Sequence, residues 1–340
     1  MKPEARTMLA CVACVLLVSA CTSATRPDAR ESLASAAPLQ PYMGQVPPGT
    51  KAQAFAPGVV NTAAIELNGV FTPDGREFFF ARHLDGISTI HHSVMGPDGW
   101  SDPVPLDVYG ASARSLAVDM AVSPDGNSLY FLGQHPHAGA PVDPTADIWV
   151  SQRVDGKWTT AEVVPAPVST AAEEYYPAVV TDGSLYFSSD RDNDAGRFGL
   201  WRAQRLPDGR FAEPVKLPPP INHEAGIGDS YVTPDERTIV FSSRRLPSQG
   251  NGDLFVAFRQ ADGSWSQPAS LGPGINTAEH EFCPMATPDG KYLFYSRRFG
   301  ATWETTTEGE VYWVDMRILE PFRPASGQVM PHEIPAVATR

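Results

Sequence analysis

The chain has few cysteines, and their positions exclude a disulfide framework. Three of the four, Cys11, Cys14 and Cys21, lie in an N-terminal segment with the composition of a signal sequence, and Cys283 is the fourth. Once that segment is cut off or modified, a single free thiol remains, so no intrachain bridge can form. We expect Cys283 to be a small buried residue of a strand and not a nucleophile.

Catalytic motifs and an excess of positive charge are also missing. There is no nucleophile elbow, no phosphate-binding glycine loop and no HExxH pair. The formal net charge of −13 disfavours nucleic acid as a partner. Beyond residue 20 no long apolar stretch has helical spacing, whereas 33 prolines and 28 glycines suit short strands and tight turns.

The N-terminus has the features of an export signal. Lys2 and Arg6 precede an apolar run from Met8 to Val18, which is too short for a permanent membrane span. Small residues before Cys21 resemble the cleavage box of bacterial lipoproteins, a likeness that implies cleavage after residue 20 and acylation of Cys21. Thr22 then favours a lipid-anchored periplasmic location at the outer membrane. An ordinary secretory signal with a chance cysteine is the alternative.

Residues 21–50 are rich in Ala, Ser and Pro and poor in large apolar side chains, which predicts a flexible tether. After it, one turn-and-strand stretch occurs five times. Its copies start at Thr72, Ser123, Thr181, Thr233 and Thr287, and the turn aspartates are 51 to 57 residues apart. Each copy continues with a third apolar strand, and most add a second Asp-Gly turn and a more polar fourth strand. Four antiparallel strands per repeat of this length predict a β-propeller blade.

The repeated Thr/Ser-Pro-Asp-Gly turn, a strand such as Leu-Tyr-Phe-Ser-Ser, and a later Asp-Ile-Trp resemble the WD-like repeats of TolB-type periplasmic propellers. This likeness covers about residues 50–325 and implies a fold, not an activity. We therefore predict an all-β, five-bladed β-propeller at residues 51–325, followed by a tail at 326–340. The repeats are expected near 61–111, 112–168, 169–221, 222–275 and 276–320.

Closure of the propeller is predicted from an echo between the two ends of the repeat region. Residues 57–62 (PGVVNT) match 273–277 (PGINT), which end a fourth strand. Residues 51–60 are therefore expected to be an orphan fourth strand that completes the last blade. Such pairing removes the exposed sheet edges of an open array.

Five acidic residues recur in the first strand of the repeats. Glu66, Glu174 and Glu281 lie eight residues before a turn aspartate, and Asp119 and Asp229 lie six before. Eight and six are both even, and residues separated by an even number along a strand point to the same face of the sheet. The five acids are therefore predicted to form a ring that lines the central channel at two heights. Such a ring would either bond neighbouring blades, or bind a cation, basic peptide or sugar, or supply a general acid and base.

Two other groups are structural or weaker candidates. An arginine follows the second strand in four repeats (Arg82, Arg191, Arg244 and Arg297), and an acid starts the third strand in three (Asp147, Asp253 and Glu310). In the fourth and fifth repeats, which have both, we expect an ion pair within the blade or a bond from the arginine to the backbone. Asp190, Asp192 and Asp194 have a spacing that suits Ca²⁺, although Trp201 stands where the bidentate Glu belongs, and a plain polar loop is the alternative. The histidines at 91–92, 135 and 137, and 280 show no complete set of metal ligands.

The sequence thus predicts a monomeric, lipid-anchored module that binds or scaffolds a protein, peptide, glycan or small ligand without catalysis. It has no expected cofactor apart from the candidate Ca²⁺. The alternative is a hydrolase, directed at glycan or peptide, that uses carboxylates in the central channel.

Overall fold

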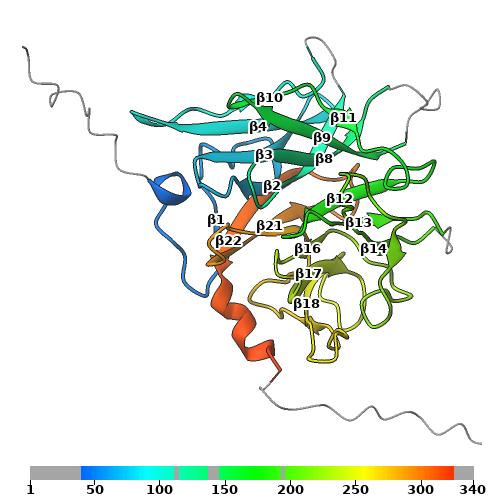
Figure 1. Ribbon diagram of the computed structural model, residues 1–340. Helices are drawn as coiled ribbons and strands as arrows, with labels where there is room; N and C mark the ends of the chain where they lie inside the picture. Colours follow the sequence, from blue (N-terminus) through cyan, green and yellow to red (C-terminus); the bar gives the residue numbers. More distant parts are fainter. Residues whose placement is uncertain (1–39, 111–114, 137–144, 193–195, 325–340) are drawn as a thin grey trace, which may run out of the picture. The chain divides into compact units, whose positions relative to one another are not determined.

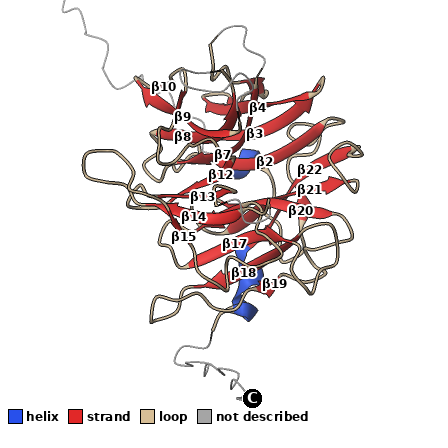
Figure 2. Ribbon diagram, turned by 90° about the vertical axis from the view of Figure 1, so that its right-hand side faces the viewer, coloured by secondary structure: helices blue, strands red, loops and turns tan. Residues whose placement is uncertain are grey.

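The computed structural model describes residues 40–110, 115–136, 145–192 and 196–324 (Figure 1). The predicted signal at 1–20, the lipidation candidate Cys21 and the predicted tail at 326–340 lie outside these ranges. Nearly all described elements are strands, with two short 3₁₀ helices, η1 (Pro41–Gly44) and η2 (Met316–Phe322) (Figure 2). In this part of the chain no helix is long and apolar enough to cross a membrane.

The described strands form four sheets, and the largest has nine strands because β2 pairs with β22 in parallel at Ile65 and Gly309. By their antiparallel pairing the strands fall into five groups, which we call units. The first unit is β2 (Ile65–Phe71), β3 (Glu77–Leu84), β4 (Ile87–Gly96) and β6 (Val104–Pro105), with β5 (Gly99–Trp100) folded back on β4. The second is β7 (Leu116–Val122), β8 (Ser128–Gln134), β9 (Asp147–Val154) and β11 (Glu162–Val163), with β10 (Lys157–Trp158) folded back on β9.

The other three units repeat this order. The third is β12 (Glu174–Val179), β13 (Leu185–Ser189), β14 (Gly199–Ala203) and β15 (Val215–Lys216). The fourth is β16 (Ser230–Val232), β17 (Thr238–Ser243), β18 (Asp253–Phe258) and β19 (Ala269–Ser270). The fifth is β20 (His280–Ala286), β21 (Tyr292–Phe299), β22 (Glu308–Asp315) and, from the other end of the described chain, β1 (Gln53–Ala54).

The pairing of β1 with β22 joins the two ends of the repeat region (Figure 1). Gln53 lies opposite Trp313, and the next amide, that of Phe55, donates to the carbonyl of Val311 at 2.8 Å. This is the pairing that the predicted closing strand requires. The first strands of the units contact each other in chain order, β2 with β7, β7 with β12, β12 with β16 and β16 with β20, and β20 also contacts β2.

The recurring turn is held by its own side chains. In the first copy the Thr72 hydroxyl donates to the Asp74 carboxylate at 2.6 Å, which also accepts the Arg76 amide at 3.0 Å. Gly75 has φ +66°, a conformation that glycine adopts without steric cost. The same hydroxyl-to-carboxylate bond recurs at Ser123, Thr233 and Thr287. The motif is therefore a folding signal for the hairpin between the first two strands.

Between units, an asparagine ties the chain to the third strand of a unit. Asn61 donates to the carbonyls of Val311 and Phe55, at 2.8 and 3.0 Å, and accepts the amide of Val311 at 2.8 Å. Asn222 and Asn276 make the equivalent bonds to Leu200 and Leu254. Each asparagine side chain satisfies backbone groups of the third strand that would otherwise pair with another strand. It therefore sets where the outer strand ends and the next unit begins.

Part of the predicted tether is packed against the sheets. Tyr42 donates a 2.5 Å hydrogen bond to Asp289 and its ring contacts Phe71, Tyr292 and Trp313. Further along, the amide of Asp315 donates to the carbonyl of Gly49 at 3.0 Å. A tether over 21–50 is thus wrong for residues 40–50, because one large aromatic ring buries enough surface to hold this segment. Residues 21–39 lie outside the described residues.

The closing strand yields a stability prediction. Phe55 is fully buried and its ring contacts Phe71, Phe78, Phe294 and Trp313, which belong to the first and last units. Phe55→Ala should lower the free energy of unfolding by about 3–5 kcal/mol, as other buried Phe→Ala changes do. Urea denaturation measures it, with the exposed Val46→Ala as the control. A loss below about 1 kcal/mol would contradict the role of Phe55 in joining the first and last units.

Candidate functional site

Glu66, Glu174 and Glu281 are fully buried and do not line a pocket. Each accepts two hydrogen bonds from the threonine four residues earlier, one from its amide and one from its hydroxyl, at 2.6–3.1 Å. The prediction of five channel-lining acids is therefore corrected for these three, whose carboxylates satisfy backbone and hydroxyl donors at the start of a unit. Burial raises the pKa of Glu174, and the bonds from Thr170 oppose that shift.

An arginine completes each of these three clusters. Arg82 and Arg297 donate through Nε to Glu66 and Glu281 at 2.8 Å, and Arg191 reaches Glu174 at 3.1 Å. In the fifth unit the ion pair within the blade thus joins Arg297 to Glu281 of the first strand and not to Glu310, the acid that starts the third. The expected bonds to the backbone are present, because Arg297 and Arg244 donate to the carbonyls of Ile275 and Asn251. In the fourth unit, which has no such glutamate, Arg245 replaces Arg244 in this role and donates to the carbonyls of Pro220 and Ile221. We call each Thr–Glu–Arg set a joint cluster.

The residues six positions before the turn aspartates form a different set and lie where the five inner strands meet. They are Asn68, Asp119, Tyr176, Asp229 and Cys283. Their bonds link different units: the Met120 amide donates to Asn68, the Cys283 amide to Asp229 at 2.9 Å, and the Tyr176 hydroxyl to the Pro284 carbonyl at 2.7 Å. We call these five the central set.

A bulge explains why the central set and the joint clusters point in different directions. In four inner strands the register shifts at this position, and Asn68, Asp119, Tyr176 and Cys283 have φ of +50° to +58°. A left-handed residue breaks the alternation of a regular strand and re-aims its side chain. The even spacing of the five acids along the sequence therefore did not place them on the same face of the sheet.

Two acids and the thiol of the central set come together. Ligand atoms of Asp119, Asp229 and Cys283 all lie within 4.8 Å of one another, and the Cys283 Sγ is 3.8 Å from Asp119 Oδ1. Burial and then the charge of Asp229 raise the pKa of Asp119 well above its ordinary value, and burial raises the pKa of Asp229 to about 6. Burial also raises the pKa of the Cys283 thiol. Two carboxylates so close in a site of low polarity resist simultaneous ionisation.

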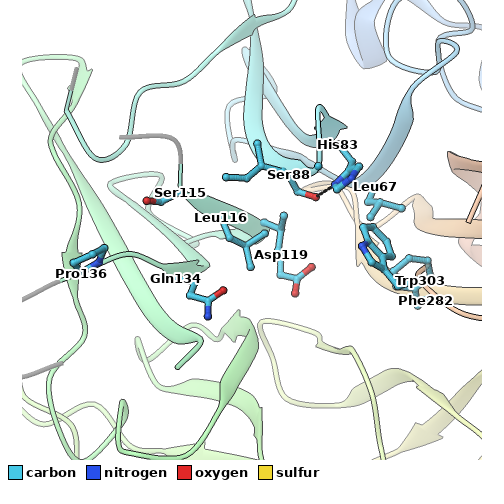
Figure 3. A pocket seen from close by; sticks show the side chains of 13 residues that line it. Leu67, His83, Ser88, Ser115, Leu116, Asp119, Gln134, Pro136, Phe282 and Trp303 are labelled. Atoms are coloured by element: carbon cyan, nitrogen blue, oxygen red, sulfur yellow. Dashed lines mark hydrogen bonds between the residues drawn. The ribbon is translucent and has the colours of Figure 1, made fainter. Parts of the chain in front are cut away.

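Asp119 also lines a cavity of about 700 Å³. Figure 3 shows its carboxylate pointing into the space between Leu116 and Gln134 on one side and Phe282 and Trp303 on the other. At the rim His83 accepts or donates a 3.0 Å bond with Ser88 and contacts the Trp303 ring edge-to-face at 5.3 Å. A concave, mostly apolar site with few polar groups is the usual form of a small-ligand pocket. We call it the central pocket.

Among the described residues, the candidate Ca²⁺ ligands and most of the histidines named from the sequence do not line the central pocket. Asp190 accepts the amide of Glu173 at 3.0 Å, Asp192 pairs with Lys216, and Asp194 lies outside the described residues. The predicted Ca²⁺ site stays a prediction. His91 and His92, which lie next to each other in β4, have pKa values lowered by burial. His135 forms a 2.7 Å bond with Ser115, and His137 lies outside the described residues.

Sequence reasoning missed the central set as a set, because only two of its five members are acidic. The joint clusters carried a visible signal: each glutamate has a threonine four residues before it and an arginine 16 or 17 residues after it. The second unit has Ala117 and Gly133 at the positions of glutamate and arginine, so the two residue types are lost together. That shared loss would have marked the glutamates as paired.

Comparisons with known proteins identify no family for this chain. No protein-family model matches it, and no curated protein does. Among solved structures, it is similar to a protein assigned as TolB from Agrobacterium tumefaciens (17% identity, TM-score 0.45), covering 69% of this chain and 71% of that one. TolB from Acinetobacter baumannii is 12% identical with a TM-score of 0.43, and the match covers 74% of this chain and only 57% of that one.

A third similar structure is the α-L-arabinofuranosidase PaAbf62A from Podospora anserina, solved in complex with cellotriose. It is 12% identical with a TM-score of 0.44, over 79% of this chain and 98% of that one. Likenesses this distant do not carry a function from one protein to another. The function proposed for this chain therefore rests on its own geometry.

The joint clusters yield a second stability prediction. Arg297→Met would leave Glu281 buried without its cation, which should lower the free energy of unfolding by about 3–5 kcal/mol. Arg237→Met is the matched control, since the Arg237–Asp235 pair is 3.8 Å apart and largely exposed. The control should cost less than about 1 kcal/mol. Equal losses in chemical denaturation would mean that the buried pair is no more than a surface contact.

The acid pair yields a pH prediction. Because the pKa of Asp229 rises from 3.8 to about 6 on folding, the folded state keeps its proton to higher pH than the unfolded state. The pair's contribution to stability is therefore present at low pH and lost as pH rises from about 4 to about 6. Asp119, Cys283 and Arg298 are the groups that act on this titration.

Removing the ionisable group should remove this loss. The free energy of unfolding of Asp229→Asn, relative to the native sequence, should rise by about 1–3 kcal/mol between pH 4 and pH 6. Urea denaturation at both pH values measures the difference, with Asp102→Asn in an exposed loop as the control. A relative stability that stays flat or falls with pH would show that the acids ionise normally.

Proposed function

We propose that the protein is a five-bladed β-propeller that binds a small ligand, or a short segment of a partner, in its central pocket. Five four-stranded units, inner strands that contact in chain order with β20 against β2, and the pairing of β1 with β22 support the closed five-bladed arrangement. The proposed role is binding or scaffolding without catalysis.

The single observation that carries this function is the central pocket with one carboxylate in it. Asp119 is partly exposed there and forms no ion pair with any described cation, while the three joint-cluster glutamates are buried and fully paired. A carboxyl group that is placed in a cavity without a cation beside it costs stability whenever it ionises, so its presence favours a functional role. Aromatic walls and few polar groups suit a ligand of modest size.

The cellular address is part of this proposal and rests on the sequence alone. Cleavage before Cys21 and acylation of that residue would anchor the protein to a membrane, facing the periplasm, with residues 21–39 as the remaining tether. Several acyl chains together give firm attachment, which a single chain does not. In this setting a monomer would capture soluble ligands close to the membrane.

Hydrolysis is the second candidate, because Asp119 and Asp229 have unequal surroundings. Asp119 lines the pocket whereas Asp229 is 8% exposed and does not. Raised pKa values suit a general acid. However, the two carboxylates approach within 4.8 Å and only Asp119 lines the cavity, which disfavours action on both sides of a scissile bond.

The binding function is tested by filling the pocket. Leu116 lies partly exposed in the pocket wall, and Leu116→Trp should occupy much of the cavity. A ligand found in a thermal-shift screen of amines, short peptides and glycans should raise the melting temperature of the native protein by several degrees and that of the variant by less than one. Val215→Trp, at a site that is 70% exposed on β15, is the control and should behave as the native protein does.

Two results would count against the proposal. A ligand that stabilises Leu116→Trp as much as the native protein binds elsewhere, which removes the pocket from the function. Turnover of chromogenic glycosides or peptide anilides that is lost in both Asp119→Asn and Asp229→Asn would instead establish the hydrolase.

A further inference from the structure

The lining of the central pocket has a negative formal charge. Among the described residues that line it, Asp119 is the only one with a formal charge, and no lysine or arginine takes part. Its other walls come from apolar side chains such as Leu67 and Leu116, from the rings of Phe282 and Trp303, and from uncharged polar residues. Those polar residues are His83, Ser88, Ser115 and Gln134. A ligand that meets this surface must therefore bring a positive charge or a strong hydrogen-bond donor to Asp119.

One described cation, Arg298, acts on the acid pair and has contacts of its own. Arg298 is 8% exposed, bonds to His280 at 3.1 Å and lies against the rings of Phe282 and Trp303. Its positive charge lowers the pKa of Asp229, and no cation lowers the pKa of Asp119 in this way. In the described part of the chain, Asp229 thus has both a backbone donor and a nearby cation, and Asp119 has neither.

A metal ion is a weaker fit than an organic cation. The Cys283 thiol is fully buried and its raised pKa keeps it protonated, while metal binding needs the thiolate. The Asp229 oxygen already accepts the Cys283 amide, so the cluster offers Asp119 as its one accessible oxygen ligand among the described residues. An ammonium group needs only one carboxylate, and its carbon chain gains from apolar and aromatic walls.

We propose that the central pocket, taken as the ligand site under the function proposed above, recognises a primary ammonium group that donates hydrogen bonds to the Asp119 carboxylate. The carbon atoms next to the nitrogen lie against Leu116 and the ring of Trp303. The amine belongs either to a small free molecule or to a lysine side chain of a polypeptide. At about 700 Å³ the cavity has room for either one.

Isothermal titration calorimetry of the protein with matched probes tests this proposal. The free-amine probe is 1,4-diaminobutane and the polypeptide probe is acetyl-Gly-Lys-Gly-amide. Their neutral counterparts are 1,4-butanediol and acetyl-Gly-Leu-Gly-amide, and cellobiose and Zn²⁺ represent the competing ligand classes. At least one amine should bind, and its neutral counterpart should bind at least tenfold more weakly.

Substitutions test whether the amine binds at Asp119. Asp119→Asn, which keeps the shape and removes the charge, should weaken amine binding at least tenfold, and Trp303→Leu should weaken it several-fold. Asp208→Asn, on an exposed turn, is the matched control and should change nothing. Because burial and Asp229 disfavour the charged form of Asp119, Asp119→Asn should fold, and its circular dichroism and melting curve verify this.

A second readout separates an ammonium from a neutral ligand. Since the acid pair holds a proton in the free protein, a bound ammonium should release part of it. The binding enthalpy of the amine should then differ between phosphate and Tris buffers at the same pH, and that difference should vanish in Asp119→Asn. A sugar or a diol is neutral and does not favour the ionised form of the acid pair, so its binding should release no proton.

Each outcome has one meaning. Binding of the diamine alone indicates a small-molecule ligand, and binding of the lysine peptide indicates a polypeptide partner; both support the proposal. Binding of cellobiose, Zn²⁺ or the neutral counterparts as tight as that of the amines overturns the ammonium class, although a loss of that binding in Leu116→Trp would leave the pocket function standing. Amine binding that Asp119→Asn leaves intact overturns the role of Asp119.

Discussion

A left-handed bend in the inner strands is the constraint on which the rest of the structure depends. Four of the five inner strands carry a residue other than glycine at φ of +50° to +58°, always six positions before the turn aspartate. Such a conformation costs on the order of 1–3 kcal/mol and persists only where neighbouring groups hold it. Here the neighbours belong to other units, since Asn68 bonds to Met120, and Tyr176 to Pro284. The bends and the assembly of the units therefore stabilise each other.

The bends also divide the acidic residues into two kinds. Before the bend, a glutamate turns away from the centre and is enclosed by a threonine and an arginine that supply as many donors as it needs. At the bend, Asp119 turns toward the centre, where its nearest neighbours are a second carboxylate and a thiol. Burial alone would predict that all these acids act alike, and it is the supply of donors that separates them. The first kind fixes the joints, and the second leaves an unbalanced charge at the centre.

Much of the fold could be predicted from the sequence because its signals are local and repeated. The Thr/Ser-Pro-Asp turn is closed by hydrogen bonds within five residues in four of its five copies, and so these four fold the same way. The β1–β22 pairing was predicted from the similarity between residues 57–62 and 273–277. The direction of the acids could not be foreseen, because a bulge depends on contacts between units and leaves no fixed residue type: Asn68, Tyr176 and Cys283 share one conformation. The packing of Tyr42 was missed for the same reason, since its partners are far away in sequence.

The contrast between the two kinds of acid bears on how function enters a repeated fold. Three repeats keep the glutamate, threonine and arginine together, and the second repeat has lost both glutamate and arginine. That repeat contributes Asp119, and its flanking residues Leu116 and Val118 line the central pocket. In a unit without the buried ion pair of a joint cluster, residues of the inner strand can line a ligand pocket. The fourth unit follows the same logic, because it lacks the glutamate, keeps Arg245 on backbone carbonyls, and supplies Asp229. The two repeats that depart from the common pattern are thus the two that place carboxylates at the centre.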